Sequence, residues 1–384
     1  MEQDFEKAFY QRTYLLSSQV PSNISLLQVK QIYQPYFLEI DTQSWNKIYA
    51  KRRTPTAIEQ FYTENLQNES RSIGFNVLLC KPTCPRRYVG FRSLQSGTNL
   101  VYSERDSRSF FKGSDTVFLQ SLPKMYRSSL IAPDGMKLVD LDLIACHISI
   151  LAWLSQDPIL KEDVLDDCHA LVGKLFFPQL SVKNQRKVGK VINTVLPMGG
   201  TKYGLHEELN ILFAKLNLTI DFDLIKAESL INCFWKRYEQ ANRYRLWSYS
   251  YIMKLRDTGE PFKVGWDGRL LFQFGNYVLR GQHLQEDRSS FIEQREIHVA
   301  MNKAILGAAS AIYRGVERVL IDTVMVSLFQ AQSQYGVIRC FCPMYDGALL
   351  VVQEGCDLLA LSAHINKQIS DWFNGMRIKI VKVG

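Results

Sequence analysis

Two aspartates lie in segments that otherwise have the apolar character of strands. Asp142 follows the run KLVDL, and Asp346 lies between CFCPMY and GALLVV. A carboxylate buried among apolar neighbours is costly unless it is paired or binds a metal. Magnesium prefers hard oxygen ligands, so two aspartates on adjacent strands would suit a two-metal phosphoryl-transfer site. From these residues alone, the alternative is that Asp346-Gly347 is a hairpin turn and that Asp142 caps a helix.

A second candidate group lies on a predicted helix. Arg186, Lys190 and Thr194 recur every four residues and so share one helical face, with Met198 next along it and Gly199-Gly200 ending the pattern. Two cations one turn apart can hold triphosphate oxygens, Arg as a planar group and Lys as a point charge. A solvated basic face is the alternative explanation of the same spacing.

The elements that must position these residues follow from hydrophobic periodicity. The segment MKLVDLDL predicts a strand, and the run ISILAWL after it predicts a helix. Helices are predicted over 158–215 and from about Ile292 to Leu320, with a hairpin over Phe262 to Phe274 that turns at Asp267-Gly268. From GVIRCFCPM to MRIKIVKV the chain predicts strand, turn, strand, helix and strand. This order indicates an α+β fold.

The composition is that of a globular protein with a mild basic excess. The 384 residues include 46 Lys and Arg against 38 Asp and Glu, a net charge of +8, with 46% hydrophobic and 22% charged residues. These values exclude wholesale disorder and predict two or three lobes. The N-terminus is acidic, and the apolar stretches are far shorter than the ~20 residues needed to span a bilayer. We therefore expect a soluble, cytoplasmic protein with a polyanionic partner and no membrane partner.

The eight cysteines are scattered through apolar surroundings. This pattern predicts reduced, buried thiols. A zinc site formed by Cys80, Cys84, Cys340 and Cys342 is the alternative, although neither pair has the usual two-residue spacing.

Several segments, in order and in content, resemble family A polymerases, the DNA polymerase I group, over most of residues 115–384. They are FLQSLPKMYRSSLIAPDGMKLVDLDLIACHISILAWLSQD, the step DCH, RKVGKVINTVLPMGGTKYGL, AMNKAILGAASAIYRGVERVL, MYDGALLVV and RIKIVKVG. The resemblance implies a right-hand polymerase with an antiparallel palm sheet, helical fingers and a reduced or divergent thumb. The palm would comprise 114–157 and 300–384, the fingers 158–299, and a thumb-like N-terminal lobe 1–113. We therefore expect a compact form without an exonuclease domain.

Carried over position by position, the resemblance implies that Asp142, Asp346 and the backbone carbonyl of Leu143 hold two Mg²⁺ ions, for which Mn²⁺ could substitute. Asp140, two residues earlier on the same strand face, is the rival of Asp142. The catalytic residues would be Asp142, Asp346, Lys190 and Arg186. Lys190 would be a candidate proton donor to the leaving pyrophosphate.

The same resemblance assigns the substrate contacts. The nucleotide would be bound by Arg186, Lys190, Thr194, His147 and Met198. The nucleic acid would be contacted by Arg108, Asn302, Tyr345 and His298. We expect a primer-template or a single-stranded DNA template, dNTPs with rNTPs as the alternative, and other replication proteins as further partners.

The departures from the family concentrate on sugar selection. His147 stands where the family has a Glu that helps to exclude the ribose 2′-hydroxyl, and Gly347 stands where the third motif has a Glu. Thr194 replaces an aromatic residue and Met198 a tyrosine, whereas the groups that perform the chemistry remain. The first hypothesis is a compact DNA polymerase. A primase-like or RNA-synthesising enzyme and an inactive nucleic-acid-binding replication factor are the alternatives.

Overall fold

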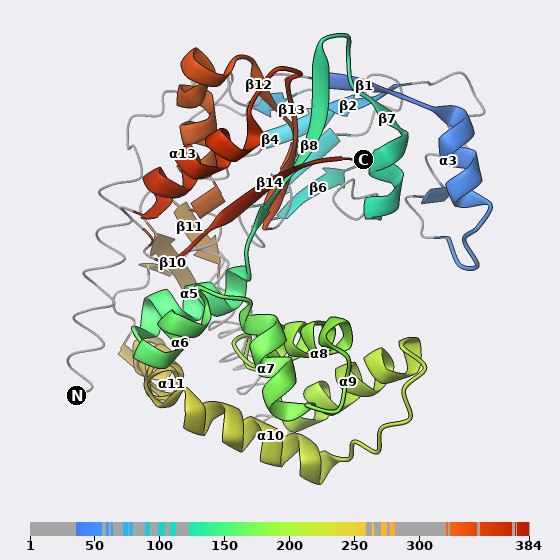
Figure 1. The fold of residues 1–384 in the computed structure, drawn as a ribbon. Coiled ribbons are helices and arrows are strands. Elements are labelled where there is room, and N and C mark those ends of the chain that lie inside the picture. The colour runs from blue at the N-terminus through green and yellow to red at the C-terminus, as the bar shows by residue number, and fades with distance from the viewer. Residues whose placement is uncertain are drawn as a thin grey trace, which may run out of the picture. The chain divides into compact units, whose positions relative to one another are not determined.

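The computed structural model describes the chain in the following ranges: 36–55, 59–60, 63, 72–75, 77–79, 89–92, 99–103, 108–112, 123–258, 263–264, 270–274, 277–280, 320–321, 323–343, 346–370, 373 and 375–383. These residues fall into two compact units (Figure 1). The first unit holds the described residues of Pro21–Leu143, Leu320–Ile369 and Arg377–Gly384, and the second those of Ile144–Val319 and Ser370–Met376. The helix expected from Ile292 to Leu320 lies outside the described residues except for Leu320.

The first unit contains a four-stranded antiparallel sheet (Figure 1), in which Asp142 lies on a strand and Asp346 directly precedes another. Its strand order is β12-β13-β8-β14, where β8 is Met136–Leu143, β12 is Ile338–Pro343, β13 is Gly347–Gln353 and β14 is Ile378–Lys382. β8 is a central strand, and five of its eight residues are buried. The strands expected around Asp142 and at the C-terminus are confirmed.

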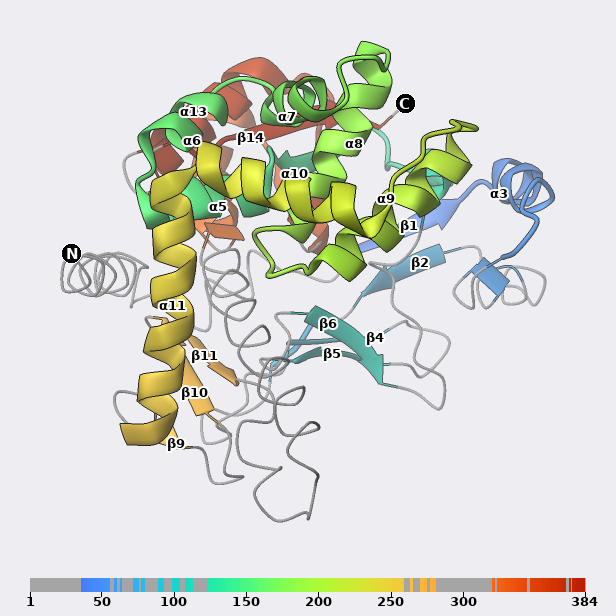
Figure 2. The same cartoon turned by 90° about the horizontal axis from the view of Figure 1, so that it is seen from below.

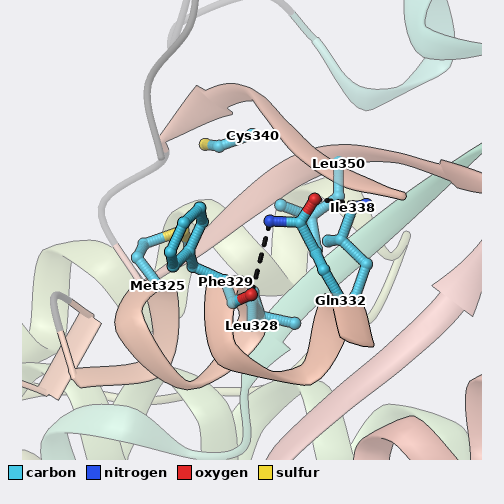
Figure 3. Close-up of a pocket in the computed structure, with 7 residues that line it drawn as sticks. All are labelled: Met325, Leu328, Phe329, Gln332, Ile338, Cys340 and Leu350. Carbon is cyan, nitrogen blue, oxygen red and sulfur yellow. Dashed lines mark hydrogen bonds between the residues drawn. The ribbon is translucent and has the colours of Figure 1, made fainter. Parts of the chain in front are cut away.

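One face of this sheet is covered by the helical residues 320–335, of which residue 322 is not described. Figure 3 shows Phe329 and its helical neighbours facing Cys340 and Leu350 of the strands around a small apolar pocket. Leu350 pairs with Val139 of β8. Because side chains alternate across a strand, Asp140 and Asp142 belong to the opposite face of the sheet, away from this pocket.

Helix α13 (Leu358–Ser370) lies beside these helical residues and beside the edge strand β14. The hydroxyl of Tyr335 donates to the Ala360 carbonyl over 3.4 Å. The Asn366 side chain exchanges two hydrogen bonds with the backbone of Ile378, at 2.7 and 3.1 Å. These contacts fix β14 next to β8 and so complete the sheet around Asp142.

The remaining described elements of the first unit precede β8. A three-stranded sheet in the order β2-β1-β7 and a four-stranded sheet in the order β3-β4-β5-β6 accompany helix α3 (Thr42–Tyr49) and the 3-10 helix η2 (Lys124–Ser129). The strands are β1 Tyr36–Ile40, β2 Ser72–Phe75, β3 Val77–Leu79, β4 Val89–Arg92, β5 Asn99–Ser103, β6 Arg108–Lys112 and β7 Leu130–Ile131. Trp45 of α3 packs against Tyr126 of η2 with ring centroids 4.3 Å apart and ring planes tilted by 46°, and both are fully buried. This packing holds η2 in place.

The second unit is mainly helical. Its helices are α5 Cys146–Ser155, α6 Pro158–Asp163, α7 Cys168–Phe176, α8 Val182–Val195, α9 Lys202–Lys215, α10 Leu224–Arg237 and α11 Glu239–Thr258. A small sheet in the order β11-β10-β9 follows, with β9 Lys263–Val264, β10 Leu270–Phe274 and β11 Tyr277–Arg280. The antiparallel pairing expected within Phe262 to Phe274 is confirmed, and the expected turn at Asp267-Gly268 lies outside the described residues. No helix among the described residues is long and apolar enough to cross a membrane.

Helices α10 and α11 meet at an angle (Figure 2), and polar contacts link their junction to α6. Asp163 at the end of α6 accepts hydrogen bonds from Arg237 and from the Tyr238 hydroxyl, the latter over 2.7 Å. Asp157 caps α6 with one carboxylate oxygen and accepts the backbone N–H groups that begin α11 with the other. Together these contacts satisfy helix ends that would otherwise lack partners.

Candidate active site

Asp142 lies in β8, and Asp346 immediately precedes the neighbouring strand β13 of the same unit. Asp142 pairs in register with Gly347, the residue after Asp346. The backbone N–H of Leu143 donates to the Asp346 carbonyl over 2.7 Å. The Asp142 side chain is 54% exposed and Asp346 is exposed. The carboxylates therefore stand at the open end of the strand pair, and the expectation that both are buried among apolar neighbours is wrong.

Gly347 is required by the close approach of the two strands. A Cβ atom at this position would lie 2.1 Å from the backbone oxygen of Leu141. Neither backbone can give way cheaply inside a paired sheet. This contact provides a physical reason for a glycine at the position where the resembled family has a glutamate.

Asp140 is the buried carboxylate of this strand, with a relative exposure of 3%. Arg127 pairs with its Oδ1 atom, and Lys124 Nζ lies 2.9 Å from its Oδ2 atom. Both cations come from η2, so Asp140 ties η2 to β8. A buried carboxylate paired in this way is satisfied without a metal, which separates Asp140 from its neighbour Asp142.

Lys124 reaches Asp142 as well. Its Nζ atom is 3.5 Å from Asp142 Oδ2, and its side chain is 62% exposed. Burial alone would lower the pKa of Lys124, but the hydrogen bond to Asp140 and the charge of Asp142 hold that pKa above its ordinary value. The ammonium group is therefore charged and bridges the two aspartates.

The chemistry of the donors at this end of the sheet fits a divalent cation. Asp142, Asp346 and the Leu143 carbonyl offer only hard oxygen atoms, and Mg²⁺ usually takes one or two protein carboxylates with waters and phosphates besides. In the part of the chain that the structure describes, no group of three or more His, Cys, Asp or Glu side chains forms a ready-made metal site. Of the cysteines in the zinc alternative, Cys340 lines the apolar pocket, and Cys80 and Cys84 lie outside the described residues.

The basic residues lie on α8 of the second unit. Arg186, Lys190 and Thr194 are exposed on one face of this helix, as the four-residue spacing predicts. The Thr194 hydroxyl donates to the Lys190 carbonyl over 2.8 Å. The helix ends at Val195, so Met198 lies in the turn that follows and not on the helical face where it was expected. Gly199 adopts φ +82°, which ends the helical pattern as expected.

Two glycines bring α7 and α8 into backbone contact. A Cβ atom on Gly189 of α8 would lie 1.8 Å from the His169 carbonyl oxygen, and one on Gly173 of α7 would lie 1.8 Å from the Gln185 carbonyl oxygen. Only glycine permits this distance between helices. The orientation of the α8 basic face is therefore set by α7.

Arg186 is held by an ion pair across this helix contact. Its Nε donates to Asp167 Oδ2 over 2.7 Å, while Asp167 Oδ1 caps the N-terminus of α7 by accepting from Ala170 N. Burial alone would raise the pKa of Asp167, but these two hydrogen bonds hold it below the ordinary value. Asp167 thus fixes the direction of the guanidinium group.

His169 lies beneath the same face and is neutral. Burial and the charge of Arg186 lower the pKa of His169 to about 4. The Asn193 Nδ2 group lies 3.1 Å from His169 Nδ1 and donates to the Cys168 carbonyl over 3.2 Å. Because this amide group is a donor, His169 Nδ1 is the acceptor and its proton is on Nε2.

The remaining predicted site residues fall in three situations. His147 is half-buried in the first turn of α5, which contacts α8 within the second unit. Arg108 begins strand β6 of the first unit and pairs in register with Ser103. The residues Asn302, Tyr345 and His298 lie outside the described part of the chain.

Lys124, Arg127 and the orienting role of Asp167 were not predicted from the sequence. The available signal for Lys124 was its place in the segment KMYR, two cations shortly before the acidic pair in DLD. The sequence does not show that these charges pair, because the pairing requires η2 to pack against β8.

The fold is similar to that of the POL domain of Pol1 from M. smegmatis, solved in complex with DNA primer-template and dNTP. The TM-score is 0.54 at 15% sequence identity, and the match covers 100% of this chain and 65% of that chain. The chain thus spans about two thirds of the length of this solved structure. No protein-family model and no curated protein matches the sequence. The similarity shows a polymerase-like fold of helices and antiparallel sheet.

Proposed function

We propose that the protein is a template-directed nucleotidyltransferase, a compact family A-like DNA polymerase that extends a primer. The observation that carries the proposal is the register of β8 and β13, in which Asp142 pairs with Gly347, the residue after the exposed Asp346, in a polymerase-like fold. Carboxylates in this arrangement suit the metal-assisted transfer of a nucleotidyl group. The expected partners are a primer-template and dNTPs.

Each candidate residue has a proposed task. Asp142 and Asp346, with the Leu143 carbonyl, would hold divalent metal ions. When bound, these ions supply positive charge to the phosphate oxygens. Lys190 and Arg186 would bind the triphosphate, Arg186 in the direction that Asp167 imposes. Lys190 is also the candidate proton donor to the pyrophosphate, because it is a flexible cation one helical turn from Arg186.

The choice of sugar is part of the proposal. His147 would lie where the resembled family excludes the 2′-hydroxyl with an acid, and an imidazole can accept or donate a hydrogen bond there. An enzyme that accepts rNTPs, or that starts without a primer, is therefore the second candidate. The same assay distinguishes the two, since it can offer both nucleotide types on primed and unprimed templates.

The test is extension of a labelled primer with Mg²⁺ by the wild-type chain and by Asp346→Asn. We expect extension by the wild type and almost none by Asp346→Asn. Asp357→Asn is the matched control, because Asp357 lies in the same unit and caps α13 through contacts that asparagine can also make. Equal extension by Asp346→Asn and the wild type would show that the assignment of the metal ligands is wrong.

A further inference from the structure

Lys124 connects a structural ion pair to the candidate metal ligand. Its Nζ atom lies 2.9 Å from Asp140 Oδ2 and 3.5 Å from Asp142 Oδ2. The other oxygen of Asp140 is paired with Arg127. Asp140 therefore carries one negative charge and meets two positive ones, so one positive charge remains to face Asp142.

The buried pair of Asp140 and Arg127 positions Lys124. Asp140 of β8 is 3% exposed, and Arg127 of η2 is largely buried. The packing of the buried Tyr126 against Trp45 supports η2 further. Lys124 itself is mostly exposed, so its ammonium group can leave Asp142 without dismantling the buried pair.

We propose that Lys124, anchored by Asp140, is a built-in counter-ion of Asp142 that weakens the binding of a divalent cation to this carboxylate. An incoming cation must displace the ammonium group from Asp142 Oδ2 or accept its repulsion at short range. Triphosphate oxygens offer the displaced ammonium group a new partner, so the metal would bind best together with a nucleotide. This inference rests on the proposed function, because it requires Asp142 to be a metal ligand.

The test measures Mn²⁺ binding to the full chain by titration calorimetry, without nucleotide or nucleic acid. Lys124→Met removes the charge but keeps most of the stem, and we expect it to bind Mn²⁺ roughly fivefold to tenfold more tightly than the wild type, as expected for loss of one partly exposed ion pair and its repulsion. Lys124→Arg restores a cation and should return the affinity to within about twofold of wild type. The difference should shrink at high salt, because the site is solvent-exposed.

Lys382→Met is the matched control. Lys382 is exposed on β14 and pairs in register with Val139, so it belongs to the face of the sheet opposite to that of Asp142. Its Mn²⁺ affinity should equal that of the wild type. Thermal unfolding of each variant checks that it is folded, and Lys124→Gln serves as a second neutral variant. Wild-type affinity in both neutral variants, with binding lost in Asp142→Asn, overturns this inference and leaves the proposed site intact. Wild-type affinity in Asp142→Asn overturns both.

Discussion

The backbone N–H of Leu143 donates to the carbonyl oxygen of Asp346 over 2.7 Å. This bond joins the last residue of β8 to the residue just before β13. It ties the backbone of Asp346 to the end of β8, one residue after Asp142. A catalytic group positioned by strands is held more accurately than one positioned by a loop alone.

Asp142 and Asp140 should respond to the same substitution in opposite ways. Asp142→Asn removes an exposed carboxylate, so we expect extension to fall on the order of a thousandfold, with unfolding free energy changed by less than about 0.5 kcal/mol. Asp140→Asn removes the negative charge that pairs with the largely buried Arg127 and with Lys124, and it should cost about 3 to 5 kcal/mol of stability. Urea denaturation and primer extension measure the two effects. If Asp140→Asn kept full stability and lost all activity, the two roles would be reversed.

Gly347→Ala should damage both the sheet and the activity. The added methyl group would meet the Leu141 backbone oxygen at 2.1 Å, so the strands must separate next to Asp142. We expect a loss of about 1 to 3 kcal/mol, as for overpacking elsewhere, together with a large loss of extension. Gly355→Ala is the control, because a Cβ at Gly355 meets nothing within 4 Å. If Gly347→Ala and Gly355→Ala had the same unfolding midpoint, the close approach of Gly347 to the Leu141 backbone would be contradicted.

Gly189→Ala should destabilise the second unit. The new Cβ would lie 1.8 Å from the His169 carbonyl oxygen, so α7 and α8 must move apart at a cost of about 3 kcal/mol. In Gly204→Ala the new Cβ would lie 4.0 Å from Thr201 Oγ1, an ordinary van der Waals contact. This control lies inside α9 and should gain up to about 1 kcal/mol from helix propensity. Opposite signs in thermal unfolding are expected, and equal shifts would disprove the helix contact.

Asp167→Asn should weaken nucleotide binding and leave the fold intact. Asparagine still caps α7, but it no longer holds Arg186 by charge. We expect the KM for the nucleotide to rise about fivefold, as befits an ion pair worth up to about 1 kcal/mol, with a smaller change in kcat. Glu162→Gln, an exposed acid at the end of α6, is the control. An unchanged KM would mean that the pair does not orient Arg186.

The stability of the native state should fall as the pH decreases below about 6.5. The pKa of His169 is lowered from its ordinary value of 6.5 to about 4, so unfolding takes up a proton between these values. The contribution is fully present above pH 6.5, is lost progressively down to about pH 4, and amounts to roughly 3 kcal/mol. Urea denaturation at pH 7 and pH 5 measures it. His169→Gln should show a shallower dependence over this range, and an identical dependence would contradict the buried neutral imidazole.

Much of the second unit could be predicted because its signals are local. The spacing of Arg186, Lys190 and Thr194 gives one face of a helix whatever surrounds it, and Gly199 at positive φ ends the pattern. The predicted helical face was continued to Met198, beyond the end of α8 at Val195, because periodicity does not show where a helix stops. The glycine contact between α7 and α8 could not be predicted, because it depends on which helix lies opposite.

The sequence by itself determined that Asp140 and Asp142 share one face of an apolar strand, because alternation is a local property of extended backbone. It could not determine which of the two is buried and which is open. The tertiary structure decided this, since η2 brings Arg127 and Lys124 onto Asp140 while Asp142 extends to the exposed end of the sheet beside Gly347. Charge pairing and strand register join residues far apart in the chain, and only packing fixes them.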